Sequence, residues 1–121
     1  MTRVSHVQAT AWIDAYVHAW QTTEPADIAA LYADDAEAYE LPYDTSWVGL
    51  PEIIAGWRER MPWQEGGWTF TGEVVALTGD TFVVSGLGVY EKLGTFENLW
   101  VVTLNDAGKC TMFRMWNNEA A

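Results

Sequence analysis

Apolar residues recur every three or four positions in the first part of the chain. Between residues 8 and 21 this spacing places them on one face of a helix. The residues on that face are Trp12, Ala15, Tyr16, Ala19 and Trp20. The polar residues of the segment, His18 among them, fall on the other faces. The pattern therefore predicts an amphipathic helix that buries Tyr16 and Trp20.

Prolines indicate where two further helices begin and end. Pro25 suits the first turn of a second helix, because the missing N–H is not needed there. The apolar pattern of this second helix stops near residues 34–35, where we expect the helix to end. Pro51 occupies the same kind of position in a third helix, which carries Trp57 and which Pro62 is expected to end.

The second half of the chain reads as strands. Residues 67–118 contain four runs rich in valine, threonine and aromatic residues, separated by the turn sequences TGD, KLG and NDAG. Such short connections predict antiparallel hairpins. Gly86 and Gly88, two apart within one run, suggest a bulge or bend that curves the sheet. No repeat or linker divides residues 1–121, so we expect one domain.

Helices followed by a bent antiparallel sheet define the α+β class. A strongly curved sheet closed by three N-terminal helices is expected to form a cone that encloses a pocket. The chain of 121 residues is 50% apolar and has eight tryptophans. Large rings suit the wall of a cavity for a small hydrophobic molecule. They would equally suit the core and a dimer interface.

Charge and composition exclude several classes of partner. The formal net charge of −11 disfavours nucleic acids and anionic membranes. No apolar run approaches the length of a membrane span, and the amino terminus lacks the apolar core of a signal peptide. We therefore expect a cytoplasmic protein without a membrane partner.

The sequence lacks the residue clusters that usually bind metals or nucleotides. Cys110 is the single cysteine, which excludes an intrachain disulfide and is typical of a small core residue. No histidine–cysteine cluster has metal spacing, no glycine loop suits phosphate, and no serine–histidine pair is evident. We expect neither a metal nor a cofactor.

One carboxylate occurs in an unusual setting. In an extended segment over residues 36–41, Ala36, Ala38 and Glu40 share one face of the strand. The pattern does not decide whether this face points inward. If it does, Glu40 would be poorly hydrated among aromatic rings, as suits a general base. If it does not, Glu40 is a solvated acid at a strand end.

Two sequence segments resemble a known family. AYVHAWQTTEPADIAALYADDAEAYE is similar to the helix–turn–helix–strand opening of ketosteroid isomerases, and LNDAGKCTMFRM is similar to their last hairpin. From roughly Ala9 to Asn118 the chain resembles the nuclear transport factor 2-like superfamily. This superfamily includes those isomerases, SnoaL-like polyketide cyclases, scytalone dehydratase and limonene epoxide hydrolase. The resemblance implies the same cone-shaped α+β fold.

The resemblance also implies roles for three residues. Tyr16 matches a tyrosine that donates a hydrogen bond to the developing enolate oxygen, although a tyrosine on a buried helix face is often structural. Glu40 matches the aspartate that acts as general base, and the match places it inward. Trp100 stands where the isomerases keep a protonated aspartate as second donor. It could hold a carbonyl, or it could close the pocket with its indole.

Alternation along the last two strands predicts which residues face the pocket. The expected pocket residues, together with two tryptophans from the helices, are Phe96, Asn98, Trp100, Phe113, Met115, Asn117, Trp57 and Trp20. The two asparagines could orient a ligand or bond to nearby backbone. Arg114 and Trp116 fall on the outer face, through which family members commonly dimerise, so we expect a homodimer.

The sequence argues against two reactions of the superfamily. Dehydratase-like members use a histidine on a strand, whereas His6 and His18 lie in or before the first helix. The Asp–Arg–Asp set of limonene epoxide hydrolase-like members is absent. The leading hypothesis is a cofactor-independent isomerase or cyclase for a small hydrophobic carbonyl compound. The alternatives are a non-catalytic binding protein for a small hydrophobic ligand and a dimerisation module.

Overall fold

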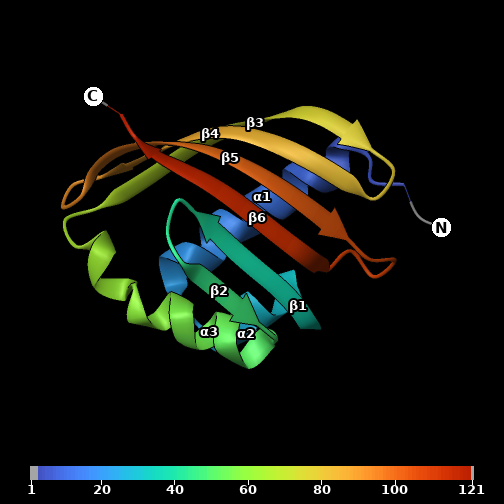
Figure 1. The fold of residues 1–121 in the computed structure, drawn as a ribbon, viewed down its shortest axis with the longest axis horizontal. Coiled ribbons are helices and arrows are strands. Elements are labelled where there is room, and N and C mark those ends of the chain that lie inside the picture. Colours follow the sequence, from blue (N-terminus) through green and yellow to red (C-terminus); the bar gives the residue numbers. More distant parts are fainter. Residues whose placement is uncertain (1–2, 121) are drawn as a thin grey trace.

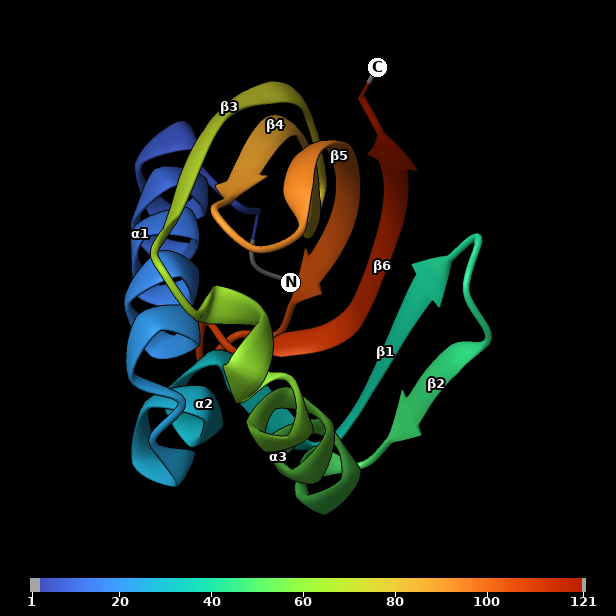
Figure 2. The same ribbon diagram turned by 90° about the vertical axis from the view of Figure 1, so that its left-hand side faces the viewer.

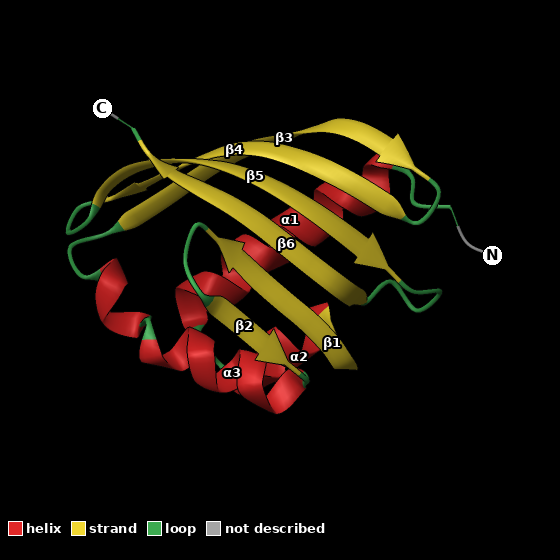
Figure 3. Cartoon of the chain, viewed as in Figure 1, coloured by secondary structure: helices red, strands yellow, loops and turns green. Residues whose placement is uncertain are grey.

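The computed structural model describes residues 3–120 and has the predicted α+β architecture, with three α-helices packed on the inner face of one curved sheet (Figure 1, Figure 3). The helices are α1 His6–Thr22, α2 Pro25–Leu31 and α3 Leu50–Glu59, followed by the short 3-10 helix η1 Met61–Gln64. The strands are β1 Tyr32–Leu41, β2 Thr45–Val48, β3 Trp68–Thr78, β4 Thr81–Tyr90, β5 Gly94–Leu104 and β6 Cys110–Glu119. Across residues 3–120, no helix is long and apolar enough to cross a membrane.

Local sequence signals set the beginning of each helix. Ser5 caps α1 through a reciprocal pair of hydrogen bonds with Gln8, which satisfies backbone N–H groups that have no partner inside the helix. Pro25 and Pro51 occupy the first turns of α2 and α3, as predicted.

Two helix ends differ from the prediction. Helix α2 ends at Leu31 and not near residues 34–35, because the chain from Tyr32 onward pairs with β6 and buries the Tyr32 ring. Helix α3 ends at Glu59, and Pro62 lies inside η1. A proline restricts the residue before it to extended or turn conformations, so the α-helical hydrogen bonds stop earlier.

The sheet has the strand order β2-β1-β6-β5-β4-β3. Strands β3 to β6 form the predicted antiparallel hairpins, and β1 pairs with β2 in the same way. The prediction of a wholly antiparallel sheet is wrong at one place, because β1 and β6 run parallel. Parallel neighbours need a long connection, and here residues 42–109, more than half of the chain, lie between them. The short strand β2 was not predicted.

The curvature of the sheet does not come from a bulge at Gly86 or Gly88. Figure 2 shows the sheet curling around the helices, and the register of β4 with both of its neighbours is regular at these glycines. The irregular registers lie elsewhere, between Val74 and Ala76 in β3, between Thr103 and Leu104 in β5 and between Tyr32 and Glu37 in β1. Gly86 instead makes room for an aromatic ring, because a Cβ atom there would lie 2.3 Å from Cζ of Phe70. The glycine is therefore needed for a close side-chain approach.

The apolar core fills one end of the space between α1 and the sheet. It includes Trp12, Ile28, Tyr32, Ile53, Phe82, Val84, Val102, Cys110 and Phe113. On β1 the inner face carries Ala36, Ala38 and Glu40, all buried, so the inward direction implied by the family resemblance is confirmed. Residues further along α1, β1 and β6 line a cavity at the other end of the space between the helices and the sheet.

The outer sheet face carries the residues expected at a dimer interface. Arg114 and Trp116 alternate with Met115 on β6, and Trp116 is the cross-strand neighbour of Leu99, an exposed leucine on β5. The structure contains one chain, and homodimerisation through this face stays a prediction.

Candidate active site: an aromatic cavity with two kinds of polar group

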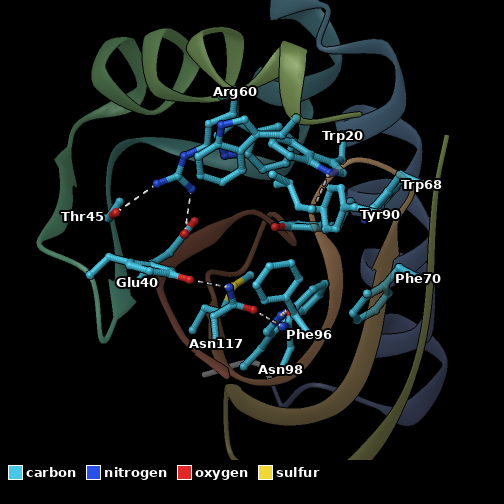
Figure 4. Close-up of a pocket in the computed structure, with 18 of the residues that line it drawn as sticks. Trp20, Glu40, Thr45, Arg60, Trp68, Phe70, Tyr90, Phe96, Asn98 and Asn117 are labelled. Atoms are coloured by element: carbon cyan, nitrogen blue, oxygen red, sulfur yellow. Dashed lines mark hydrogen bonds and ion pairs between the residues drawn. The ribbon is translucent and has the colours of Figure 1, made fainter. Parts of the chain in front are cut away.

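A cavity of about 520 Å³ opens between the sheet and the helices, large enough for a small organic molecule (Figure 4). The residues that line it are Tyr16, Trp20, Glu40, Tyr43, Thr45, Trp57, Arg60, Trp63, Trp68, Phe70, Gly88, Tyr90, Leu93, Phe96, Asn98, Trp100, Met115, Asn117 and Glu119. They come from α1, α3, η1 and all six strands or their connections. Nine of the ten residues predicted for the site are among them.

The exception is Phe113, which was predicted to face the pocket. Its side chain is 2% exposed and packs in the core, with its ring centroid 5.7 Å from that of Tyr16. Strand alternation correctly gives the face of β6, but it does not give the depth along the strand. Met115, one step further along the same face, reaches the cavity wall.

Tyr16 is held from several sides by aromatic rings. Its ring centroid lies 4.4 Å from that of Trp100 and 5.0 Å from that of Trp57. Its hydroxyl makes no hydrogen bond to any residue in the described range 3–120, although it belongs to the cavity wall. Burial, and next the negative charge of Glu40, raise the pKa of Tyr16 well above its ordinary value. The hydroxyl therefore stays protonated and can donate.

Glu40 is 8% exposed and forms an ion pair that was not predicted. Nη1 of Arg60 lies 2.7 Å from Oε1 of Glu40, while Nη2 of Arg60 donates to the hydroxyl of Thr45 at 2.9 Å (Figure 4). The expected aromatic rings share the cavity wall with Glu40, but its cationic partner was not expected. The guanidinium stabilises the charged carboxylate. Oε2 of Glu40 accepts no hydrogen bond within the described part of the chain.

Arg60 is itself fixed by two indole rings. Its guanidinium carbon lies 4.5 Å from the ring centroid of Trp47 and 4.6 Å from that of Trp63, within the range of cation–π attraction. The Trp47 ring rests on Gly56 of α3, where a Cβ atom would lie 2.2 Å from Cε2 of Trp47. Glycine at position 56 thus lets the indole support Arg60.

A second cluster gathers around Tyr90 at the end of β4. Nε1 of Trp20 donates to the Tyr90 oxygen at 3.1 Å (Figure 4). Trp68 is the cross-strand neighbour of Tyr90, and its indole N–H acts on the Tyr90 oxygen and lowers the Tyr90 pKa. Within residues 3–120, Nε1 of Trp68 is nevertheless buried without a complete hydrogen bond. Burial dominates and raises the pKa of Tyr90 to about 12, while the hydrogen bond from Trp20 lowers it.

The two asparagines form a chain of side-chain hydrogen bonds. Trp100 donates from Nε1 to Oδ1 of Asn98 at 3.3 Å, and Asn98 donates to its cross-strand neighbour Asn117. Asn117 then donates to the Tyr43 hydroxyl at 3.3 Å. Both side chains thus bond to other side chains and not to nearby backbone. The indole N–H of Trp100 is used inside the protein, and its ring stacks on Phe70 at 4.8 Å, so Trp100 closes the wall.

Sequence reasoning missed Arg60, Thr45 and Tyr90. Arg60 lies 20 residues from Glu40 and has no periodic relation to it. One signal was available, because Arg60 is one of only six cations in a chain of net charge −11 and lies three residues before Trp63. Within residues 3–120, no group of three or more histidine, cysteine, aspartate or glutamate residues could hold a metal ion.

Solved structures similar to this chain share its fold. A structure of an inferred isomerase of the SnoaL-like family from Agrobacterium tumefaciens superposes with a TM-score of 0.74 at 15% identity, covering 93% of this chain and 98% of that one. An inferred ketosteroid isomerase from Kribbella flavida gives a TM-score of 0.72 at 20% identity, covering 96% and 82%. A Mycobacterium tuberculosis epoxide hydrolase described as LEH-like gives 0.66 at 16% identity, covering 93% and 84%.

The sequence comparison is more specific than these structural matches. No curated protein matches the sequence. The family description "SnoaL-like domain" matches residues 13–113, which span α1 to the middle of β6 and include most of the cavity wall. With its nuclear transport factor 2-like fold, this chain belongs to the SnoaL-like domain family.

Proposed function

We propose that this protein is an acid–base enzyme of the isomerase or cyclase type, which acts on a small, uncharged and mostly apolar compound with an enolisable carbonyl group. One observation carries the proposal. The Tyr16 hydroxyl and Oε2 of Glu40 both lack hydrogen-bond partners within residues 3–120, and both residues line the same aromatic cavity.

The two groups suit complementary steps of one reaction. The substrate carbonyl oxygen would accept a hydrogen bond from Tyr16, while Oε2 of Glu40 removes a proton from the adjacent carbon. The electron pair of the broken C–H bond moves to the carbonyl oxygen and gives an enolate. Where a C=C bond adjoins the deprotonated carbon, the product is a dienolate, and return of the same proton from Glu40 to its far end gives the conjugated isomer, so no other reactant is required. In a cyclase, the enolate carbon would instead attack a second carbonyl in the same substrate, and the alkoxide oxygen formed there would take the proton back from Glu40.

The charges of the wall support an uncharged substrate. Arg60 is the cation among the lining residues, and its charge is compensated by Glu40 at 2.7 Å. Glu119 adds an exposed carboxylate at the rim. An anionic ligand would therefore meet a net negative wall, whereas the many aromatic rings favour an apolar body.

The Glu40→Gln variant tests the mechanism. We expect it to reduce exchange of the α-hydrogen of cyclic ketones with D₂O by about 10²- to 10⁴-fold, the range typical of a lost general base. Mass spectrometry of a ketone panel measures the exchange whatever product the enzyme forms. Glu37→Gln is the matched control, since Glu37 lies on the same strand but not in the cavity wall. Unchanged exchange with Glu40→Gln would show that this carboxylate is not the base.

The Glu40–Arg60 ion pair favours a second candidate, a non-catalytic binding protein for the same class of ligand. One oxygen of the carboxylate is already bound to the guanidinium at 2.7 Å, an arrangement that also serves to hold the wall together without any reaction. This function predicts no exchange above the solution rate for any ketone. It also predicts that Glu40→Gln leaves ligand affinity nearly unchanged, as equilibrium dialysis would show.

A further inference from the structure

We propose that Tyr90 is a second hydrogen-bond donor to the oxygen of the bound ligand, acting beside Tyr16. This inference rests on the proposed function and deepens it. The family resemblance suggested Trp100 for the second donor, but the Trp100 N–H already donates to Asn98. The cavity would therefore lack a second donor unless another side chain provides one.

Trp20 connects Tyr90 to the side of the cavity that carries Tyr16. Tyr16 and Trp20 are four residues apart on α1, so their side chains lie on the same side of that helix. Trp20 holds the Tyr90 oxygen at 3.1 Å from its Nε1. Tyr90 and Glu40 both act electrostatically on Tyr16, which agrees with all three groups facing one part of the cavity.

The hydrogen bonds around the Tyr90 oxygen leave its proton unused. A phenol oxygen can accept bonds through its lone pairs and can donate one. Trp20 occupies one acceptor position, and the N–H of Trp68 faces the same oxygen without completing a bond. No acceptor for the Tyr90 proton is found among the described residues. Because indole N–H groups face the lone pairs of the Tyr90 oxygen, its O–H can donate into the cavity.

A purely structural role explains only half of this arrangement. Tyr90 supplies the acceptor that the indole N–H of Trp20 needs, and that accounts for the Tyr90 oxygen. It does not account for the hydroxyl proton, which has no acceptor within residues 3–120 although Tyr90 lines the cavity. A carbonyl oxygen that becomes an enolate would accept from both tyrosines, and such donors are most effective when charge develops on the oxygen.

A naphthol and its hydrocarbon analogue separate a donor from a wall residue. 2-Naphthol enters the cavity as a neutral phenol, and when it ionises there it has an aromatic body and an oxyanion, as an enolate of a two-ring ketone does. Naphthalene has the aromatic body alone. We expect Tyr90→Phe to weaken binding of 2-naphthol at pH 9 by about 5- to 10-fold and to lower its ionised fraction in the complex. Binding of naphthalene should change less than about twofold, because a phenylalanine fills nearly the same volume.

Two further variants complete the experiment. Tyr39→Phe removes a hydroxyl from a residue that does not line the cavity, and it should alter neither ligand. Trp20→Phe removes the N–H that fixes the Tyr90 oxygen, and it should weaken binding of 2-naphthol by about threefold. This variant tests the inference in case Tyr90→Phe does not fold. Affinities come from equilibrium dialysis, and the ionised fraction comes from the absorbance of naphtholate.

Each outcome has a definite meaning. Equal losses for 2-naphthol and naphthalene would make Tyr90 a wall residue, and unchanged 2-naphthol binding in Tyr90→Phe and Trp20→Phe would also overturn the inference. If neither ligand binds the unmodified protein, the cavity does not take this class of molecule, and the proposed function falls as well. Loss of exchange in Glu40→Gln tests the base alone and does not depend on Tyr90.

Discussion

Two groups of polar side chains line the same cavity and differ in where their hydrogen bonds go. On the side formed by β1, β2 and the end of α3, Glu40 bonds to Arg60 and Arg60 bonds to Thr45. On the side formed by α1 and the end of β4, the hydroxyl protons of Tyr16 and Tyr90 have no acceptor within residues 3–120.

This difference indicates which groups are available to a ligand. A polar group already bonded inside the protein must lose that bond before it binds a ligand, so its net contribution to affinity is small. A donor without a partner gains a bond and loses none. The bonded side therefore fixes the shape of the wall and the position of one carboxylate oxygen, whereas the tyrosine side is the place where a ligand oxygen would be recognised.

The largest expected effect comes from removing the cation on the bonded side. Arg60→Met should lower the free energy of unfolding by about 3 kcal/mol, because the buried Glu40 carboxylate would lose its partner. Urea unfolding at pH 7 measures the loss. Glu40→Leu combined with Arg60→Met should recover most of it, since no unpaired charge remains.

Arg58 provides the matched control for this experiment. Arg58 lies in the last turn of α3, two residues before Arg60, but it is exposed. Arg58→Met should therefore change the stability by less than about 0.5 kcal/mol. Equal stability of the Arg58→Met and Arg60→Met variants would contradict a structural role for the Glu40–Arg60 pair.

The next effect concerns the tyrosine side and depends on pH. Burial raises the pKa of Tyr90 to about 12, whereas the unfolded chain has the ordinary value of 10.0. Below pH 10 both states keep the proton and the stability is full. As pH rises from 10 towards 12 the unfolded state ionises first, so the stability falls, by about 2 kcal/mol from this residue.

Urea unfolding between pH 8 and pH 11.5 tests this dependence. The stability of Tyr90→Phe should fall less steeply above pH 10 than that of the unmodified protein. Burial also raises the pKa of the Cys110 thiol to about 12, so both proteins are best compared in a Cys110→Ala background. If stability falls equally steeply with pH in both proteins in that background, burial does not oppose ionisation of the Tyr90 hydroxyl.

Periodicity predicted the elements that build the cavity better than the contacts inside it. The helical spacing in the first segment placed Tyr16 and Trp20 on the buried face, and period-two alternation placed Asn98, Met115 and Asn117 inward. These patterns depend on local backbone geometry, which each segment carries in its own sequence.

The ion pair and the tyrosine cluster depend on which distant segments meet. Arg60 reaches Glu40 because α3, which Arg60 follows directly, packs against β1. Tyr90 reaches Trp20 because the end of β4 lies beside the end of α1. Neither contact has a spacing in the sequence that could reveal it. For the same reason the parallel pairing of β1 with β6 escaped a prediction made from neighbouring hairpins.

The smallest expected effects lie along the hydrogen-bond chain from Trp100 through Asn98 and Asn117 to Tyr43. Removing a residue of this chain should cost less stability the further that residue lies from the buried Trp100. Asn98→Leu leaves the N–H of Trp100, a residue that is 1% exposed, without an acceptor and should cost about 1 kcal/mol of stability. Tyr43→Phe removes only the exposed last link, where water can replace the hydroxyl, and should cost less than about 0.5 kcal/mol. Asn117→Leu should fall between them. Urea unfolding of the three variants measures this order. A larger loss for Tyr43→Phe than for Asn98→Leu would mean that the exposed Tyr43 hydroxyl, and not the buried Trp100 N–H, fixes the two asparagines. A ligand that bonds to Tyr43 would then also displace the asparagine side chains of the wall.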